Sequence, residues 1–114
     1  MAARVVRWSD AAQRDLDDIV DYIAADSTIN AEAVLDRLYG QAQSLEQFAE
    51  RGRRLPELAG RRRSGHANWR ELVVRPWRMV YAIEGATVLV LAVVDSRRDF
   101  RAWLAGRSSA DLSR

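Results

Sequence analysis

The spacing of the apolar residues changes once along this chain, and that change limits the folds it can adopt. From residue 10 to residue 48, apolar side chains recur at steps of three and four, as in amphipathic helices. From residue 69 to residue 94 they alternate or run continuously, as in the strands of a sheet. The pattern predicts a helical half followed by a sheet, which is typical of a two-layer α+β domain.

Two helices are predicted in the first half. Ser9 suits the N-cap of the first helix, which begins at Asp10. A break at residues 27–30 separates it from the second helix, for which Gly52 is the predicted stop. Their apolar stripes contain Ala12, Leu16, Ile19, Val20 and Ile23, then Val34, Leu35, Leu38, Ala42, Leu45 and Phe48. So short a break predicts an antiparallel hairpin with one shared apolar side.

Strands are predicted at residues 4–8, 69–75, 77–84 and 88–94, with Pro76 at a bend where its missing N–H costs no ladder bond. Met79, Tyr81 and Ile83 should face one side of the sheet, and Arg78, Val80 and Ala82 the other. The stretch 52–67 is predicted to be an extended loop with a short turn at "PEL". A short helix with Phe100, Trp103 and Leu104 follows, and residues 105–114 form a tail.

The predicted order is therefore strand, helix hairpin, three-stranded antiparallel meander and short helix. This describes a single α+β domain over residues 1–114, with its core at about 4–104 and the helix hairpin packed on a small antiparallel sheet. A chain of 114 residues with 48% hydrophobic and 30% charged residues is consistent with one soluble domain.

Composition excludes several kinds of function. The chain has no cysteine, which excludes a disulfide framework, a thiolate metal site and a cysteine nucleophile. No apolar run approaches the roughly 20 residues of a membrane helix, and no targeting signal is visible, so we expect no membrane partner and a cytoplasmic location. The net charge of +2 is too small for a global field that would by itself indicate nucleic-acid binding.

The chain contains no lysine, so all 18 of its basic residues are arginine. GC-rich codon usage is the favoured explanation of the missing lysine, ahead of a functional one. A guanidinium binds carboxylate and phosphate through a planar fork but cannot act as a general base at ordinary pH. The arginines therefore favour anion binding over proton transfer.

Five arginines of the sheet region are the candidate target-binding residues: Arg70, Arg75, Arg78, Arg97 and Arg98. One hypothesis is that they converge at one end of the sheet and bind carboxylates or phosphates of a large partner. The alternative is that Arg70 and Arg78 are edge residues whose stems snorkel and whose charges are paired. Glu71 and Asp95 are interpreted as ion-pair partners rather than acid–base catalysts. The run Arg61, Arg62 and Arg63 is interpreted as a solvated surface.

Proton carriers for catalysis are scarce. Cleaving RNA needs a base for the 2′-hydroxyl, a donor for the leaving oxygen and cations for the phosphate. His66 is the only histidine and lies in the predicted loop, where histidines are usually solvated, and Tyr81 is predicted to be a core tyrosine with a satisfied hydroxyl. Four acids of the first helix fit a solvent-exposed surface: Asp15, Asp17, Asp18 and Asp21. We therefore expect neither a metal site nor a cofactor. Binding without catalysis is favoured.

Large aromatic residues supply candidates for a partner interface: Trp69, Trp77, Phe100 and Trp103. A small domain rarely buries so many indoles completely, and tryptophan is enriched at interface centres. We expect an apolar groove between the helix hairpin and the sheet that receives a segment of a partner.

Five short stretches occur in a recognisable order: "DLDDIVDYIA", "RGRRLPEL", "WRELVV", "WRMVYAIEG" and "LAVVDSRRD". In this order and spacing they resemble the RelE/ParE superfamily of bacterial toxins from type II toxin–antitoxin pairs, over about residues 4–104. The sequence is more similar to the ParE branch. The RNA-cleaving branch typically places lysine, arginine and tyrosine, or histidine and glutamate, around the RNA, whereas the last helix here offers Phe100 and Trp103.

The resemblance implies a toxin that inhibits DNA gyrase by binding, without chemistry of its own. It also implies a cognate, ParD-like antitoxin, whose C-terminal tail folds on the toxin while its N-terminal part binds operator DNA. The alternative is a RelE-like endoribonuclease that cleaves messenger RNA on the ribosome. A third interpretation is a decayed toxin that survives as a binding module.

Overall fold

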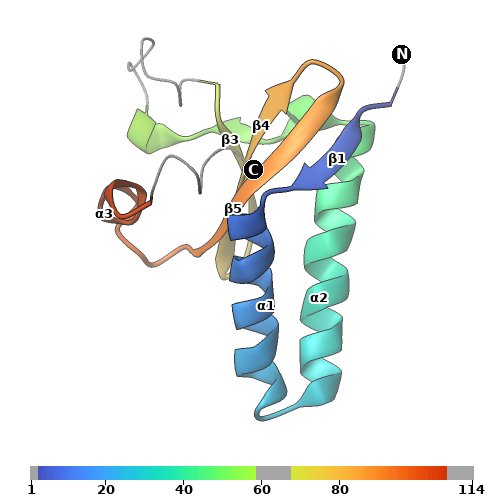
Figure 1. Cartoon of the computed structure of the whole chain (residues 1–114), viewed down its shortest axis with the longest axis vertical. Coiled ribbons are helices and arrows are strands. Elements are labelled where there is room, and N and C mark those ends of the chain that lie inside the picture. Colours follow the sequence, from blue (N-terminus) through green and yellow to red (C-terminus); the bar gives the residue numbers. More distant parts are fainter. Residues whose placement is uncertain (1–2, 59–67, 108–114) are drawn as a thin grey trace.

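The structure, a computed structural model, describes residues 3–58 and 68–107. Helices and strands follow the predicted order (Figure 1). The strands are β1 (Val5–Trp8), β2 (Arg53–Arg54), β3 (Arg70–Val74), β4 (Trp77–Glu84) and β5 (Thr87–Asp95). The helices are α1 (Asp10–Ala24), α2 (Thr28–Gln43) and α3 (Phe100–Ala105), with 3₁₀ turns η1 (Ser44–Glu46), η2 (Ala49–Arg51) and η3 (Pro56–Leu58). The predicted α+β fold is confirmed.

The helix hairpin begins and turns where the sequence predicts. The side chain of Ser9 accepts a hydrogen bond from the Ala12 amide at 3.0 Å, which caps α1, and Ser27 caps α2 by accepting from the Asn30 amide at 3.1 Å. The two helices lie side by side and extend past the end of the sheet (Figure 1). No helix of the described ranges is both long enough and apolar enough to cross a membrane.

The sheet is larger and more mixed than the predicted meander. Its strand order is β1-β5-β4-β3-β2, so the first strand of the chain lies next to the last. β1 pairs with β5 in parallel, from Val5 opposite Thr87 to Trp8 opposite Val90, while the other pairs are antiparallel. The chain between β1 and β5 passes through the α1–α2 hairpin and then through β2, β3 and β4, which supplies the long connection that parallel neighbours need.

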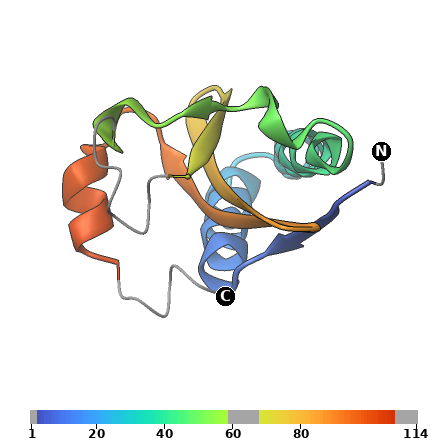
Figure 2. The ribbon, with the colours of Figure 1, turned by 90° about the horizontal axis from the view of Figure 1, so that it is seen from above.

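Both faces of the sheet are buried. Met79, Tyr81 and Ile83 pack into the cluster that includes Leu16 and Leu38 of the helix hairpin, as predicted from their alternation. The opposite face forms a second apolar cluster with α3 and η3. In both views α3 lies away from the hairpin (Figures 1 and 2). The sheet is therefore covered on two sides, whereas the sequence predicted helices against one.

β5 carries apolar residues toward both clusters, and its alternation shifts once at a bulge. The register jumps between Val80 opposite Ala92 and Tyr81 opposite Val90, which leaves Leu91 as the extra residue of a bulge. Leu91 and Ala92 consequently pack in the same cluster, and Val93 returns to the hairpin side.

The sequence predicted that the second helix ends at Gly52, and this prediction is wrong. α2 ends at Gln43, and two 3₁₀ turns follow before Gly52. The Gly52 amide donates to the Tyr81 hydroxyl at 3.0 Å, and that hydroxyl donates to the Ala49 carbonyl at 2.6 Å. The glycine is needed for this close approach, since a Cβ would lie 2.4 Å from the Tyr81 oxygen and 2.7 Å from the Glu71 carbonyl oxygen.

We expect Gly52→Ala to lower the free energy of unfolding by about 2 kcal/mol, because a methyl group has no room between Tyr81 and strand β3. Gly40→Ala is the matched control, since a Cβ there meets nothing within 4 Å and alanine favours the helix by about 1 kcal/mol. Urea unfolding of both variants measures the difference. Equal stability of the two variants would contradict the packing described for Gly52.

Candidate functional site: a buried arginine network and a cleft

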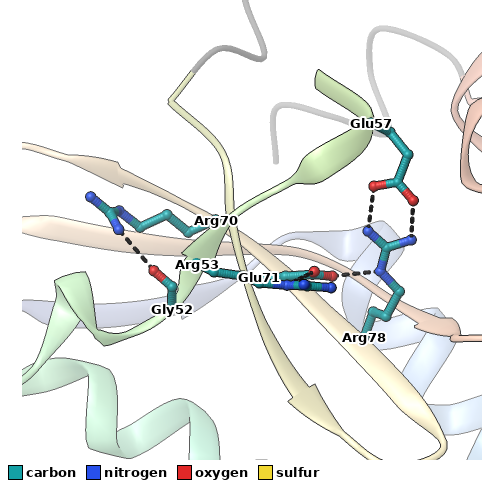
Figure 3. Close-up of polar contacts among 6 residues, drawn as sticks. All are labelled: Gly52, Arg53, Glu57, Arg70, Glu71 and Arg78. Carbon is teal, nitrogen blue, oxygen red and sulfur yellow. Dashed lines mark hydrogen bonds and ion pairs between the residues drawn. The ribbon is translucent and has the colours of Figure 1, made fainter. Parts of the chain in front are cut away.

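Arg78 is the centre of a charged network on the face of the sheet that α3 covers. Glu71 and Arg78 lie diagonally on neighbouring strands, since Glu71 is opposite Val80 and Arg78 opposite Val73. Arg78 Nε donates to Glu71 Oε1, and its two terminal nitrogens donate to the two Glu57 carboxylate oxygens at 2.8 and 2.7 Å (Figure 3). The guanidinium therefore uses all three nitrogens within the protein.

The centre of the network is buried, and its charges balance, while Glu57 is partly exposed and Arg53 is mostly exposed. Arg78 is 7% exposed and Glu71 1% exposed. Arg53 of β2 donates from Nε to Glu71 Oε2 at 2.6 Å, and the guanidinium carbon of Arg78 lies 4.7 Å from the centre of the Phe100 ring. Two guanidiniums and two carboxylates thus satisfy one another, which is the condition for burying charge without a large penalty.

The protonation of this network follows from its contacts. The hydrogen bonds from Arg78 lower the pKa of Glu57 below its ordinary value, against the opposing effect of burial. The hydrogen bonds to Glu57, followed by those to Glu71, raise the pKa of Arg78 although burial acts in the other direction. The Arg78–Glu57 pair is therefore charged at neutral pH.

Arg70 points away from Arg78 and belongs to a different set of contacts (Figure 3). One of its terminal nitrogens donates to the carbonyls of Gly52 at 2.8 Å and Glu50 at 3.2 Å. Tyr81 lies opposite Arg70, on the face of the sheet that the helix hairpin covers. It is buried and its hydroxyl is hydrogen-bonded, which confirms the sequence interpretation. Burial raises the pKa of the Tyr81 phenol, which keeps it protonated at neutral pH.

A cleft of about 500 Å³ opens between α1, the end of the sheet and the α3 region. Trp77 and Trp103 line it together with Arg97 and Arg98, and Ile19, Tyr22 and Ile23 of α1 form the opposite wall. Arg97 pairs with Asp95 at 2.7 Å, and this contact lowers the pKa of Asp95 to about 2. The cleft therefore combines tryptophans with arginines, and Asp15, Asp18 and Asp95 line it as well.

Asp15 and Arg107 close one side of this cleft. Both Asp15 carboxylate oxygens accept from Arg107 at 2.8 Å, and Asp15 also accepts from the Val93 amide at 3.0 Å. Burial raises the pKa of Asp15 above its ordinary value. The prediction that Asp15 is a wet surface acid is therefore wrong. Its position three residues after Ala12 and four before Ile19 placed it beside the apolar stripe, and that was the missed signal.

The predicted convergence of five arginines is wrong. Arg70 begins β3 and Arg75 follows its last residue, and a five-residue strand is about 17 Å long. Arg75 is exposed at the turn, where its carbonyl accepts from Arg37. Arg97 and Arg98 meet at the cleft, whereas Arg78 is buried in its own network. Whether any of the five contacts a target stays a prediction.

The aromatic candidates divide into two pairs. Trp69 and Phe100 are 6% and 2% exposed and pack in the second apolar cluster. Trp77 and Trp103 are half-buried and line the cleft. Their role in a partner interface stays a prediction, as does that of Trp69 and Phe100.

Sequence reasoning missed Arg53, Glu57 and Arg107. Glu71 and Asp95 do form ion pairs with arginine, as interpreted, although the Glu71 pair is buried. His66 and the run Arg61, Arg62 and Arg63 lie outside the described residues. Within residues 3–58 and 68–107, no three acidic or histidine side chains are grouped closely enough to hold a metal ion.

We expect Glu57→Gln to lower the free energy of unfolding by about 2 kcal/mol at pH 7, because Arg78 loses a charged bidentate partner. The folded protein lowers the pKa of Glu57, so the stabilisation is complete above the ordinary value of 4.5 and is lost as the pH falls through the lower folded value. Urea unfolding of both proteins at pH 7 and pH 3 measures this. An unchanged difference at pH 3 would rule out the charged pair.

A protein-family model matches most of the chain. The model for the ParE toxin of the type II toxin–antitoxin system parDE matches residues 6–100. The toxin–antitoxin system ParDE from the chromosome of P. aeruginosa has a similar structure, with a TM-score of 0.64 and 23% identity over 82% of this chain and 96% of that one.

The toxin–antitoxin complex RelBE2 from Mycobacterium tuberculosis is also similar in structure, with a TM-score of 0.52 and 23% identity over 82% of this chain and 99% of that one. These two likenesses show the fold. A search among curated proteins gave no significant match. The family match covers far more than half of the chain and agrees with the resemblance seen in the sequence, so the chain belongs to the ParE toxin family of type II toxin–antitoxin systems.

Proposed function

We propose that this ParE-family toxin inhibits DNA gyrase by binding, acts in the cytoplasm, and is neutralised by a cognate antitoxin. The resemblance to the ParE branch implies the target, and the similarity to two toxin–antitoxin structures supports an antitoxin partner. The observation that carries binding rather than catalysis is the internal use of Arg78, whose guanidinium is held by Glu57 and Glu71.

RNA cleavage makes two demands that these contacts oppose. A phosphate-stabilising arginine must exchange its partners for phosphate oxygens, and Arg78 would then leave two carboxylates, one of them buried, without a cation. A tyrosine acting as acid or base must reach the substrate, and the Tyr81 hydroxyl is buried between Gly52 and Ala49. Both residues serve the fold in their present positions.

The cleft is the proposed contact surface for a large partner. It presents Trp77 and Trp103 beside Arg97 and Arg98, and interfaces are enriched in tryptophan and arginine at their centres. Arg98 is exposed at the rim, so its replacement can test the surface without removing a buried contact.

A direct test compares two assays on the purified toxin: supercoiling and DNA cleavage by gyrase, and cleavage of messenger RNA on programmed ribosomes. We expect inhibition of supercoiling and intact messenger RNA. RNA cut at codon positions, with gyrase unaffected, would replace the proposal with the RelE-type ribonuclease, which the similarity to RelBE2 keeps as the second candidate.

We expect Arg98→Ala to raise the toxin concentration needed for half-inhibition of gyrase by about tenfold, the effect of losing about 1.4 kcal/mol of binding. Arg101→Ala is the matched control, because Arg101 is also exposed but does not line the cleft. Thermal unfolding should be unchanged in both variants. Equal inhibition by Arg98→Ala and the wild type would remove the cleft from the gyrase contact.

A further inference from the structure

Asp15 lies where α1 takes over from β1 as the neighbour of β5. The pairing of β1 with β5 ends at Val90, and side chains of the following residues then bond to β5. The Ser9 hydroxyl donates to the Leu91 carbonyl at 3.3 Å, and Asp15 accepts from the Val93 amide at 3.0 Å. A neutral asparagine oxygen could accept from the same amide, so this contact alone does not require a carboxylate.

The charge of Asp15 serves Arg107, which follows α3. One terminal nitrogen of Arg107 donates to both Asp15 carboxylate oxygens at 2.8 Å, and the two side chains are only 13% and 19% exposed. The guanidinium carbon of Arg107 lies 4.5 Å from the centre of the Trp103 ring. The Trp103 ring in turn lies 5.2 Å from the ring of Phe100. Asp15 therefore connects α1 to the aromatic side chains of α3.

Stability does not explain why this carboxylate is charged. Burial is the largest influence on Asp15 and raises its pKa, although the Val93 amide and Arg107 act in the opposite direction. The folded protein therefore binds this proton more tightly than the unfolded chain, so ionising Asp15 as the pH rises lowers the free energy of unfolding. Departures from the most stable arrangement are expected where a residue serves function.

α3 is too short to hold its end in place by itself. It has six residues, and isolated helices shorter than about 12 residues are marginal in water, so tertiary contacts must fix its position. Phe100 anchors the start of α3 because it is buried in the second apolar cluster, and Arg107 anchors the end on Asp15. Trp103 lies between the two anchors and lines the cleft together with both members of the ion pair.

We propose that Asp15 is a positioning residue of the cleft, because its ion pair with Arg107 holds Trp103 and the end of α3 in the arrangement that a partner meets. Asp15 acts through Arg107 rather than by touching the partner. The effect on a partner rests on the proposed function, in which the cleft contacts gyrase. The positioning of Trp103 does not depend on the identity of the target.

The first test is fluorine NMR of the full chain labelled with fluorotryptophan. The four tryptophans give four signals, and Trp103→Phe identifies the one from Trp103. Asp15→Asn keeps an acceptor for the Val93 amide but loses the charge that holds Arg107. We expect Asp15→Asn and Arg107→Gln to shift or broaden the Trp103 signal. Asp17→Asn, an exposed residue of the same helix outside the cleft, should leave it unchanged.

An unmoved Trp103 signal in Asp15→Asn would overturn the proposal. If urea unfolding then showed a loss of stability, Asp15 would have a structural role only. An equal shift of the Trp103 signal in Asp17→Asn would also contradict the assignment, because that variant removes a charge without touching the ion pair.

The second test measures the toxin concentration for half-inhibition of gyrase supercoiling. We expect Asp15→Asn and Arg107→Gln each to raise it about fivefold, a size typical of residues that act through others. The double variant should show no further increase, because Asp15 acts through Arg107. Effects that multiply in the double variant would contradict this. If the wild type does not inhibit gyrase, the proposed function fails, and the Trp103 signal alone decides the positioning role of Asp15.

Discussion

The buried pair between Arg78 and Glu71 is the interaction on which the arrangement of this sheet depends. It joins β3 to β4 on a face that is otherwise apolar, and its charges are completed by Arg53 from β2 and Glu57 from η3. Removing Arg78 or Glu71 takes one partner from the other, buried charge, and breaking a buried ion pair commonly costs several kcal/mol. The network therefore fixes where β2 and η3 lie against the meander.

Much of the fold was accessible from the sequence, because period and capping are local signals. The stripe around Leu16, the cap at Ser9 and the alternation of Met79 and Tyr81 all predicted structure correctly. The parallel pairing of β1 was not accessible, since residues 5–8 carry no mark of their neighbour. Nor was the function of Gly52, which is required by the hydroxyl of a residue far along the chain.

The site was harder to predict for the same reason. The alternation along β4 predicts which face of the sheet Arg78 occupies. It does not predict that Glu57, from a turn distant in the sequence, contacts Arg78. Charge alone therefore made Arg78 look like a binding residue, although its contacts make it part of the core. Arg98 and Trp103 came together at the cleft because the chain after β5 returns toward α1, where Arg107 is held by Asp15. The contacts of this ParE-family toxin therefore distinguish Arg78, which is held inside the fold, from Arg97 and Arg98, which are exposed at the cleft.

A double-mutant cycle between Arg78 and Glu57 tests most directly whether Arg78 is committed to the fold. The free energies of unfolding of the wild type, Arg78→Gln, Glu57→Gln and the double variant are measured by urea unfolding at pH 7. The bidentate contact predicts a coupling energy of about 2 kcal/mol. A coupling energy below about 0.5 kcal/mol would show that the two residues act independently, and Arg78 would again be a candidate for binding an external anion.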